Sequence, residues 1–399
     1  MYKTLTFLGI AVLSLVVIGF IVLASAGENN SLRLTHNATQ YLFLTRQGIW
    51  IGISFCFLLA TTFFDYHHWR DWPWLTIAFY VVVIILMSAV WAFPATKGSH
   101  RWLRLGSIRL QPSELAKILV VISSGVLMDR LGWRIERFWK GAMPTVAVVA
   151  VLMGLAVAEP DFGATMVIAL TAGILFLIAG MRIVHMILMG LAGLGAVGTL
   201  LFFNANRMNR IAAWLPSWLA SAMGVSPEAM AANAEKDANY QLDHALEAIR
   251  RGGVFGAGFA RSDEKLGYLP EAHTDFIFAI GAEEWGVIFS IVVLVLFVVF
   301  FICGMIIAAN APDRLGRLLA YGMTFIIFFQ ALFNLGVVTG LLPTKGLALP
   351  FISYGGTNLI TAMVALGTLF NVGRQIDRPL ARSSSAFVAS SFRTDTFSS

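Results

Sequence analysis

The stretch WGVIFSIVVLVLFVVFFICGMIIA, residues 285–308, contains no charged side chain. About 20 apolar residues are enough for a helix to cross the ~30 Å hydrocarbon core of a membrane. Comparable runs recur along the chain, and they predict an all-α integral membrane protein with about ten transmembrane helices. The expected spans lie near residues 5–25, 47–64, 74–94, 113–129, 142–158, 163–181, 183–203, 285–308, 317–341 and 356–373.

The composition agrees with this prediction. The 399 residues are 58% hydrophobic and 13% charged, with a mean hydropathy of +0.77, whereas a soluble globular chain is usually about 25% charged. Cys56 and Cys303 both lie inside apolar runs, so they predict neither a disulfide framework nor a zinc site. No phosphate-binding loop or dinucleotide fingerprint is present, and we expect no nucleic-acid partner and no bound metal ligated by the protein.

Lysine and arginine residues near the span ends indicate the orientation, because they favour the cytoplasmic side. With a cytoplasmic N-terminus and an even number of spans, the C-terminus is cytoplasmic too. The basic residues that then lie inside are Arg130, Arg134, Arg137, Lys140, Arg182, Arg314, Arg317, Arg374, Arg378 and Arg382. One short outer loop, with Lys97, Arg101, Arg104 and Arg109, breaks the rule. It either meets an anionic partner or merely tolerates its cations.

The chain organises into a membrane domain over residues 1–381 and a Ser-rich cytoplasmic tail over residues 382–399, which we expect to be disordered. The first run ends in Leu23-Ala24-Ser25-Ala26. It therefore also resembles a signal peptide with a small-residue cleavage site. The apolar body that follows is instead typical of a first transmembrane helix.

The only long polar insert runs from about residue 204 to 274, between the seventh and eighth expected spans. A loop of this length is usually functional or disordered. Within it, Tyr240–Arg251 is predicted to form an amphipathic helix with Leu242, Leu246 and Ile249 on its apolar face. We therefore expect a partly ordered extracytoplasmic loop that lies at the membrane interface.

The segment His273-Thr274-Asp275-Phe276 joins this loop to the eighth span. Thr274 or Asp275 can cap the helix that follows, a role worth about 1 kcal/mol. Alternatively, Asp275 can serve as a general base at the membrane surface, where apolar neighbours raise the pKa of a carboxylate. His273 either tunes that carboxylate or is a neutral interfacial histidine.

Two further groups of charged residues lie near expected span ends. Glu114 and Lys117 are three residues apart at the start of the fourth span, so they can pair on one helix face. Ionisable residues inside a span normally face the bundle interior or a cavity, and a structural ion pair and a site role are both open. Asp161, in the turn Glu159-Pro160-Asp161, is expected to cap the sixth span.

The segment from Leu342 to Gly356 is too interrupted by proline and glycine to be a plain span. Irregular backbone at membrane depth must be buried in protein or line a wet cavity. Gln330 and Asn334, one turn apart on the ninth span, add hydrogen-bonding groups nearby. Together these features predict an internal polar cavity that opens outward.

Several motifs, taken in order along the chain, resemble those of the SEDS family (shape, elongation, division and sporulation). These are Gln111–Lys117, Pro160–Gly163, Tyr240-Gln241, Pro270–Phe276, Pro343–Gly346 and Ser353–Gly356. Pro343-Thr344-Lys345-Gly346 and Glu271-Ala272-His273 are similar to the cell-division branch, FtsW, more than to the elongation branch, RodA. The sequence departs from the family pattern at Lys97, Glu159 and Thr357-Asn358.

The resemblance implies a peptidoglycan glycosyltransferase that polymerises lipid II on the outer face of the bacterial cytoplasmic (inner) membrane, at the division site. It implies that Asp275 is the catalytic acid–base group. The residues expected to bind substrate are Arg101, Glu114, Lys117, Asp161, Arg207, Arg210, His273, Lys345 and Ser353. Cations or a divalent metal ion would neutralise the undecaprenyl pyrophosphate leaving group.

By the same resemblance, the expected partner is a class B penicillin-binding protein, a transpeptidase, alongside other divisome membrane proteins. Two other classes of function remain open. A lipid II flippase or transporter also needs buried charges, interrupted helices and an outward cavity, although no internal repeat is visible. A non-catalytic scaffold of the division complex needs only the partner contacts.

Overall fold

A computed structural model of the chain describes residues 1–34, 42–94, 100–105, 108–202, 238–259, 261–262, 273–342 and 346–377. Within these ranges, ten helices have 16 residues or more. They are α1 (Tyr2–Leu34), α2 (Leu42–Phe63), α4 (Pro73–Ala89), α5 (Pro112–Leu131), α6 (Met143–Ala158), α7 (Phe162–Ile178), α8 (Ile183–Phe202), α13 (Ile277–Ala309), α14 (Arg314–Val338) and α15 (Gly356–Ile376).

These helices confirm the predicted fold class, and their bounds follow the apolar runs closely. Seven of the described helices, α1, α2, α4, α6, α13, α14 and α15, are long and apolar enough to cross a membrane. The apolar parts of α7 and α8 are shorter, and α5 carries buried ionisable groups in its first turns. The total of ten spans therefore stays a prediction.

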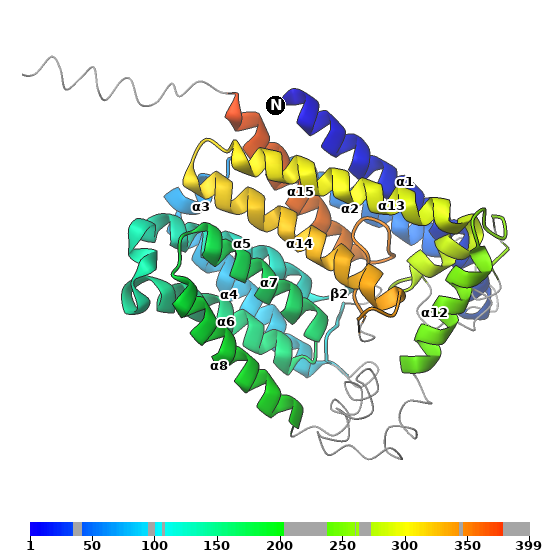
Figure 1. The fold of residues 1–399 in the computed structure, drawn as a ribbon, viewed down its shortest axis with the longest axis horizontal. Coiled ribbons are helices and arrows are strands. Elements are labelled where there is room, and N and C mark those ends of the chain that lie inside the picture. The colour runs from blue at the N-terminus through cyan, green and yellow to red at the C-terminus, as the bar shows by residue number, and fades with distance from the viewer. Residues whose placement is uncertain are drawn as a thin grey trace, which may run out of the picture.

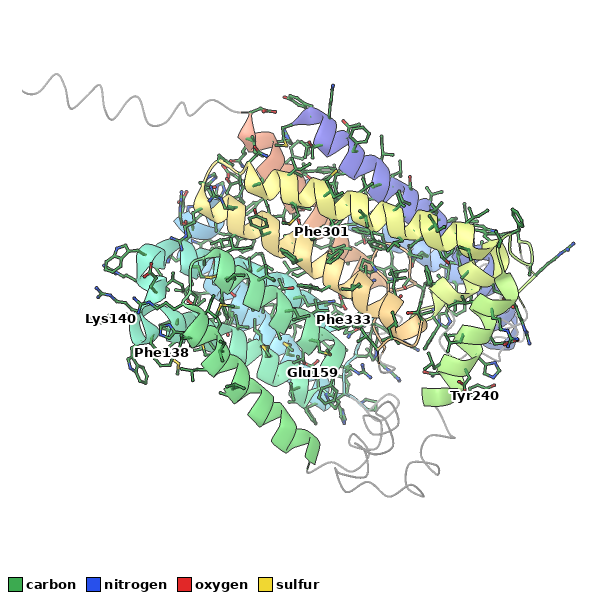
Figure 2. The ribbon with its side chains drawn as sticks, viewed as in Figure 1. Phe138, Lys140, Glu159, Tyr240, Phe301 and Phe333 are labelled. Carbon is green, nitrogen blue, oxygen red and sulfur yellow. The ribbon has the colours of Figure 1, made fainter. Side chains whose placement is uncertain are left out.

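The two ends of the bundle are distinct (Figure 1). The amino group of Met1 lies 4.0 Å from Oδ2 of Asp377, so α1 begins where α15 finishes. We name this the terminal end. The opposite end carries a short antiparallel hairpin of β1 (Leu103–Leu105) and β2 (Ile108–Leu110), and we name it the hairpin end. Figure 2 places Lys140 toward the terminal end and Glu159 toward the hairpin end.

Helices that are distant in sequence pack along their lengths. α1 packs on α13, α13 on α14, and α2 on α15, while α5 packs on α14, α6 and α7, and α7 also packs on α14. Short pieces at the terminal end are α3 (His68–Asp71) and the irregular turns Gly132–Glu136 and Phe138–Ala142. α5 and α14 thus form the centre of the bundle, and both carry polar residues that face inward.

The described part of the long insert contains α12 (Ala238–Gly252), which confirms the predicted amphipathic helix. α12 lies across the hairpin end, at a steep angle to α13 and α14 (Figure 1). Its buried positions are Ala245 and Ala248, whereas Leu246 is 40% exposed. Leu242 and Ile249 are partly buried, so the expected apolar face turns toward the bundle, and the small alanines beside it allow close packing on α13.

α13 begins at Ile277, eight residues before the expected start of the eighth span at residue 285. The earlier start was not predicted because Glu283 and Glu284 lower the hydropathy just before residue 285. In the structure both of these side chains are buried. Gly286 has non-helical backbone angles, φ 71° and ψ −160°, so α13 is broken there. The sequence analysis anticipated neither this break nor the β1–β2 hairpin.

Candidate active site

The turn at residues 273–276 places Asp275 at the hairpin end, directly before α13. The N-cap position of α13 is Phe276, so neither Thr274 nor Asp275 occupies it and the capping interpretation is wrong. Asp275 is partly exposed. Its carboxylate lies against Gly346, where an added Cβ would stand 2.6 Å from Oδ2 of Asp275. Glycine at 346 therefore leaves room for the carboxylate.

Asn334 of α14 ties this turn to the irregular segment that precedes α15. Its side-chain amide donates to the carbonyl oxygen of Asp275 at 2.8 Å and to that of Leu347 at 2.6 Å. Asn334 is itself buried. A buried carbonyl left without a donor costs about 1–3 kcal/mol. This one side chain supplies a donor to both backbone segments and so fixes the distance between them.

Ser353 joins the same two segments from the other side. Its hydroxyl donates to the carbonyl of Thr274 at 2.6 Å and accepts from the backbone N–H of Leu349 at 2.7 Å. The backbone N–H of Tyr354 donates to the carbonyl of His273 at 3.1 Å. Ser353 therefore acts on the backbone of the Asp275 turn in this structure. The predicted burial of irregular backbone in protein is confirmed for this segment.

Lys117 lies at the centre of a buried polar network. Its ammonium group is 2.8 Å from Oε1 of Glu114 and donates to Oε1 of Gln330 at 2.5 Å. The Gln330 amide in turn donates to the carbonyl of Ala348 and to Oδ1 of Asn358, both at 2.8 Å. The predicted Glu114–Lys117 pair is confirmed. Because buried ions need partners, the pair connects α5 through α14 to the segment beside Asp275.

Asp161 caps α7, as expected: Oδ1 accepts from the backbone N–H of Ala164 at 3.1 Å. Its other oxygen, Oδ2, accepts from the Ser113 hydroxyl at 2.6 Å and from the Gln111 amide at 2.7 Å. Asp161 is almost completely buried. It therefore fastens the start of α5 to the start of α7, a role that the local sequence did not reveal.

The start of α7 also contacts the segment beside Asp275. A Cβ added to Gly163 would stand 2.6 Å from Cγ of Leu347, the residue whose carbonyl Asn334 holds. The starts of α5 and α7, the ninth expected span and the interrupted segment therefore meet at one place. The cavity itself stays a prediction, since residues 263–272 and 343–345 of its lining lie outside the described chain.

Glu159 is a buried carboxyl beside this junction, and no role was predicted for it. Its side chain is fully buried, and neither oxygen has a hydrogen-bond partner among the described residues. Burial and the neighbouring charge of Asp161 raise its pKa to about 8, against the lowering effect of Arg101. Glu159 is therefore protonated at neutral pH. In the sequence, the only indication of this buried group was a glutamate placed directly after an apolar run.

The ring of His273 packs in an aromatic group. Its centroid lies 5.0 Å from that of Phe43 on α2 and 5.9 Å from that of Tyr354. Phe43 and Tyr354 contact each other edge to face at 5.3 Å. This packing orients the turn that carries Asp275, and both interpretations of His273 stay predictions.

Three of the predicted substrate-binding residues, Arg207, Arg210 and Lys345, lie outside the described residues. Arg101 directly precedes the hairpin and lies close enough to Glu159 to lower its pKa. In the described ranges, His, Cys, Asp and Glu side chains do not gather into a group of three or more suited to a metal ion. The structure thus brings together Asp275, Ser353, His273, Asp161, Glu114 and Lys117.

Comparisons with known proteins agree with this arrangement. The family model described as "Cell cycle protein", which covers FtsW, RodA and SpoVE, matches residues 6–378. A probable peptidoglycan glycosyltransferase FtsW of Geobacter sp. (strain M18) is 32% identical over 360 residues, 90% of this chain and 93% of that protein. Stage V sporulation protein E of Bacillus subtilis is 34% identical over 337 residues, 84% of this chain and 88% of that protein.

Two solved structures share the fold. A chain from "Structural coordination of polymerization and crosslinking by a peptidoglycan synthase complex" has a TM-score of 0.70 and 24% identity, covering 93% of this chain and 98% of that one. The rod shape determining protein RodA of Thermus thermophilus has a TM-score of 0.65 and 24% identity, covering 93% and 97%. The helical architecture around the Asp275 turn is therefore an established one.

Proposed function

Because the chain belongs to the FtsW, RodA and SpoVE family of cell cycle proteins, we propose that it is a peptidoglycan glycosyltransferase. It is a multi-pass protein of the bacterial inner membrane. Its substrate is lipid II as both donor and acceptor, and its product is the glycan of septal cell wall. The similarity to relatives named FtsW supports the division branch over the elongation branch.

Asp275 is the catalytic residue, and the observation that carries this assignment is the way its turn is held. Asn334, Ser353 and the backbone of Tyr354 bind three successive carbonyls, those of Asp275, Thr274 and His273. The backbone is thus fixed while the carboxylate remains partly exposed. A fixed base with an accessible side chain suits general base catalysis, which requires hydrogen-bond reach to the proton it removes.

In the reaction, the 4-hydroxyl of the acceptor N-acetylglucosamine attacks the anomeric carbon of the donor. A new carbon–oxygen bond forms, and the bond from the anomeric carbon to the pyrophosphate oxygen breaks with inversion. Asp275 accepts the hydroxyl proton, and undecaprenyl pyrophosphate leaves with the bonding electrons. The transition state resembles an oxocarbenium ion, as in other inverting sugar chemistry. Fixed cations near the leaving group stabilise the charge that develops there.

The hairpin supplies such cations. Arg104 and Arg109 are directly opposite each other across β1 and β2, and Arg101 precedes β1. Like charges at directly opposed strand positions repel each other, and an anionic ligand would offset that repulsion. We assign the hairpin to the pyrophosphate of the donor, with Arg207, Arg210 and Lys345 as further candidates. A divalent cation can share this role, and activity measured after chelation tests it.

The orientation follows from charge. The terminal end is cytoplasmic, because it carries Arg130, Arg134, Arg137, Lys140, Arg182, Arg314, Arg317 and Arg374. The hairpin end and Asp275 then face outward, where the lipid II disaccharide is used. The structural match to a chain of a peptidoglycan synthase complex supports a class B penicillin-binding protein as partner, and the exposed apolar face of α13 is a surface for its single span.

The test uses purified protein with its partner and labelled lipid II, in wild-type, Asp275→Asn and Asp71→Asn forms. Asp71 is an exposed carboxylate at the terminal end and serves as the matched control. We expect polymer from the wild type and the control and none from Asp275→Asn. Lipid translocation without polymer, unaffected by Asp275→Asn, would establish the flippase instead. Normal division with Asp275→Ala at normal protein levels would favour the scaffold.

A further inference from the structure

α13 consists of two pieces that meet at Gly286. A short helical piece, Ile277–Trp285, follows the Asp275 turn, and a long piece, Val287–Ala309, continues to the terminal end. We name the first the stub. A break in a helix leaves backbone N–H and C=O groups without intrahelical partners, and such groups must be satisfied at membrane depth.

The glycine-rich segment after α12 supplies those partners. The backbone N–H groups of Ala257 and Gly258 donate to the carbonyls of Glu283 and Glu284 at 2.9 and 3.0 Å. In return, the N–H of Val287 donates to the carbonyl of Gly253 at 2.9 Å. The segment thus bonds to both sides of the break.

This backbone approach leaves no room for side chains. A Cβ on Gly256 would overlap the carbonyl oxygen of Glu284, and one on Gly286 would overlap the carbonyl oxygen of Val254. Both glycines also have positive φ, 82° and 71°, a conformation that other residues adopt only with strain. The two glycines are therefore required by the contact between the segment and the stub.

Two buried carboxylates fasten the stub to its neighbours. Glu283 accepts a short hydrogen bond from the hydroxyl of Ser262, and Glu284 accepts one from Ser25 of α1. All four side chains are at most 2% exposed. A buried polar group needs a hydrogen-bond partner, so the stub is held by α1 on one side and by residues 252–259 and 261–262 on the other.

We propose that residues 252–259 and 261–262, together with the Gly286 break, form a mount that sets the position of the catalytic carboxylate, an inference that rests on the proposed function. The stub begins two residues after Asp275. Asn334 and Ser353 hold the turn directly, and the mount holds the stub that follows it. Gly256, Gly286, Ser262 and Glu283 are positioning residues, since they reach the site only through the stub.

The main test compares Gly286→Ala and Gly256→Ala with Gly154→Ala, where a Cβ meets nothing within 4 Å. A misplacement of about 1 Å in a catalytic group costs on the order of 100-fold in rate. We expect kcat to fall by that order in the first two variants, with KM for lipid II within about twofold of wild type, and no change in Gly154→Ala. The acidic limb of the rate–pH profile, which reports the base, should shift only in the mount variants.

A milder series decides the question even if the glycine variants fail to fold. Glu283→Gln keeps an acceptor for the Ser262 hydroxyl, whereas Glu283→Leu and Ser262→Ala remove the bond. We expect kcat to be largely retained in Glu283→Gln and reduced about tenfold in the other two, the equivalent of one strong hydrogen bond. Wild-type kcat and an unshifted pH profile in Ser262→Ala and Glu283→Leu would contradict the proposed positioning role of the mount. The wild type and Asp275→Asn are assayed in the same experiment. If the wild type forms polymer and Asp275→Asn does not, the proposed function holds even where the positioning role of the mount fails.

Discussion

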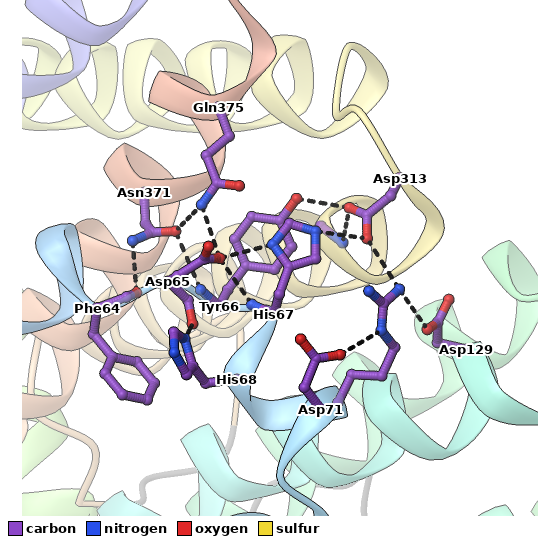
Figure 3. Close-up of polar contacts among 12 residues, drawn as sticks. Phe64, Asp65, Tyr66, His67, His68, Asp71, Asp129, Asp313, Asn371 and Gln375 are labelled. Atoms are coloured by element: carbon purple, nitrogen blue, oxygen red, sulfur yellow. Dashed lines mark hydrogen bonds and ion pairs between the residues drawn. The ribbon is translucent and has the colours of Figure 1, made fainter. Parts of the chain in front are cut away.

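Around the Asp275 turn neutral side chains bind backbone carbonyls, whereas around Asp313 ionisable side chains bind one another. Asn334 and Ser353 donate to carbonyls of the Asp275 turn. At the other end, Asp313 accepts from the hydroxyl of Tyr66 at 2.7 Å and lies 3.4 Å from the ring of His67 (Figure 3). The first kind of contact is insensitive to pH, and the second titrates.

The terminal network joins helices that also build the site. Arg70 lies 3.7 Å from Asp129 on α5 and 3.8 Å from Asp313, which caps α14. Asn371 of α15 donates to the carbonyls of residues 61, 62 and 64. α5, α14 and α15 are therefore fastened by charges and amides at one end (Figure 3), while at the other end Asn334 of α14 and Ser353 before α15 bind the Asp275 turn. The comparison teaches that positioning and anchoring are separated along the same helices.

The pKa values follow from this network. A hydrogen bond to Asp313 raises the pKa of His67, opposed by burial and aided by Asp65. Burial acts to raise the pKa of Asp65, but hydrogen bonds from the His67 backbone and ring and from Gln375 outweigh it and lower that pKa to about 2. The pKa of Asp313 is lowered in the same manner by His67 and Tyr66, against burial. His67 is thus held in its protonated form to a higher pH than an isolated histidine.

The largest expected effect comes from paired substitutions at the two ends, Asn334→Leu and Asn371→Leu. Asn334→Leu leaves two buried carbonyls without donors, so we expect kcat to fall on the order of 100-fold through displacement of Asp275. Asn371→Leu should lower thermal stability and leave kcat within about twofold. Glycan polymerisation and melting of the solubilised protein measure both. Equal loss of kcat from the two variants would break the proposed separation.

The next effect concerns the hairpin cations. Arg104→Gln and Arg109→Gln each remove one charged donor from the cross-strand pair, so we expect about a tenfold rise in KM for lipid II. Arg70→Gln is the matched arginine change at the terminal end and should leave KM unchanged. Initial rates at varied lipid II concentration test this. An unchanged KM in both hairpin variants would contradict the assignment of the donor pyrophosphate to the hairpin.

A smaller effect is expected from Glu159→Gln, which tests a buried titratable carboxyl group at the hairpin end. Because the folded pKa of Glu159 is raised to about 8 from 4.5, the folded protein holds its proton more tightly than the unfolded chain. Stability contributed by this group therefore falls as pH rises from 4.5 to 8. Glu159→Gln removes that loss, so it should melt at a higher temperature than wild type at pH 7.5 and at a similar one near pH 4.5. A lower melting temperature at pH 7.5 would contradict protonation of Glu159.

The smallest effect is expected from His67→Gln. Since the folded pKa of His67 is raised above its usual value of 6.5, its stabilisation is complete below about pH 6.5 and is lost as pH rises through the folded value. The variant should melt on the order of 2 °C below wild type at pH 6 and match it at pH 9. The rate–pH profile of polymerisation should be the same in both. A shift of that profile would show that the terminal network reaches the site.

Much of the fold could be predicted from hydropathy. The apolar runs gave α14 and α15 to within a few residues, and the spacing of Glu114 and Lys117 gave their ion pair. The resemblance to SEDS proteins pointed to Asp275, which composition alone would have left as a helix cap. The predicted start of α13 was wrong, because Glu283 and Glu284 are ionisable residue types that suggested a loop, whereas both side chains are buried in the helix.

The sequence by itself determined an all-helical membrane protein, since burial of backbone in lipid allows few alternatives to apolar helices of span length. It also determined which carboxylate to examine. Only the tertiary structure decided that Asn334 and Ser353 hold the Asp275 backbone, that two hairpin arginines oppose each other, and that Gly286 divides α13. These features depend on partners far apart along the chain, whereas hydropathy and helix propensity report only on neighbours in sequence.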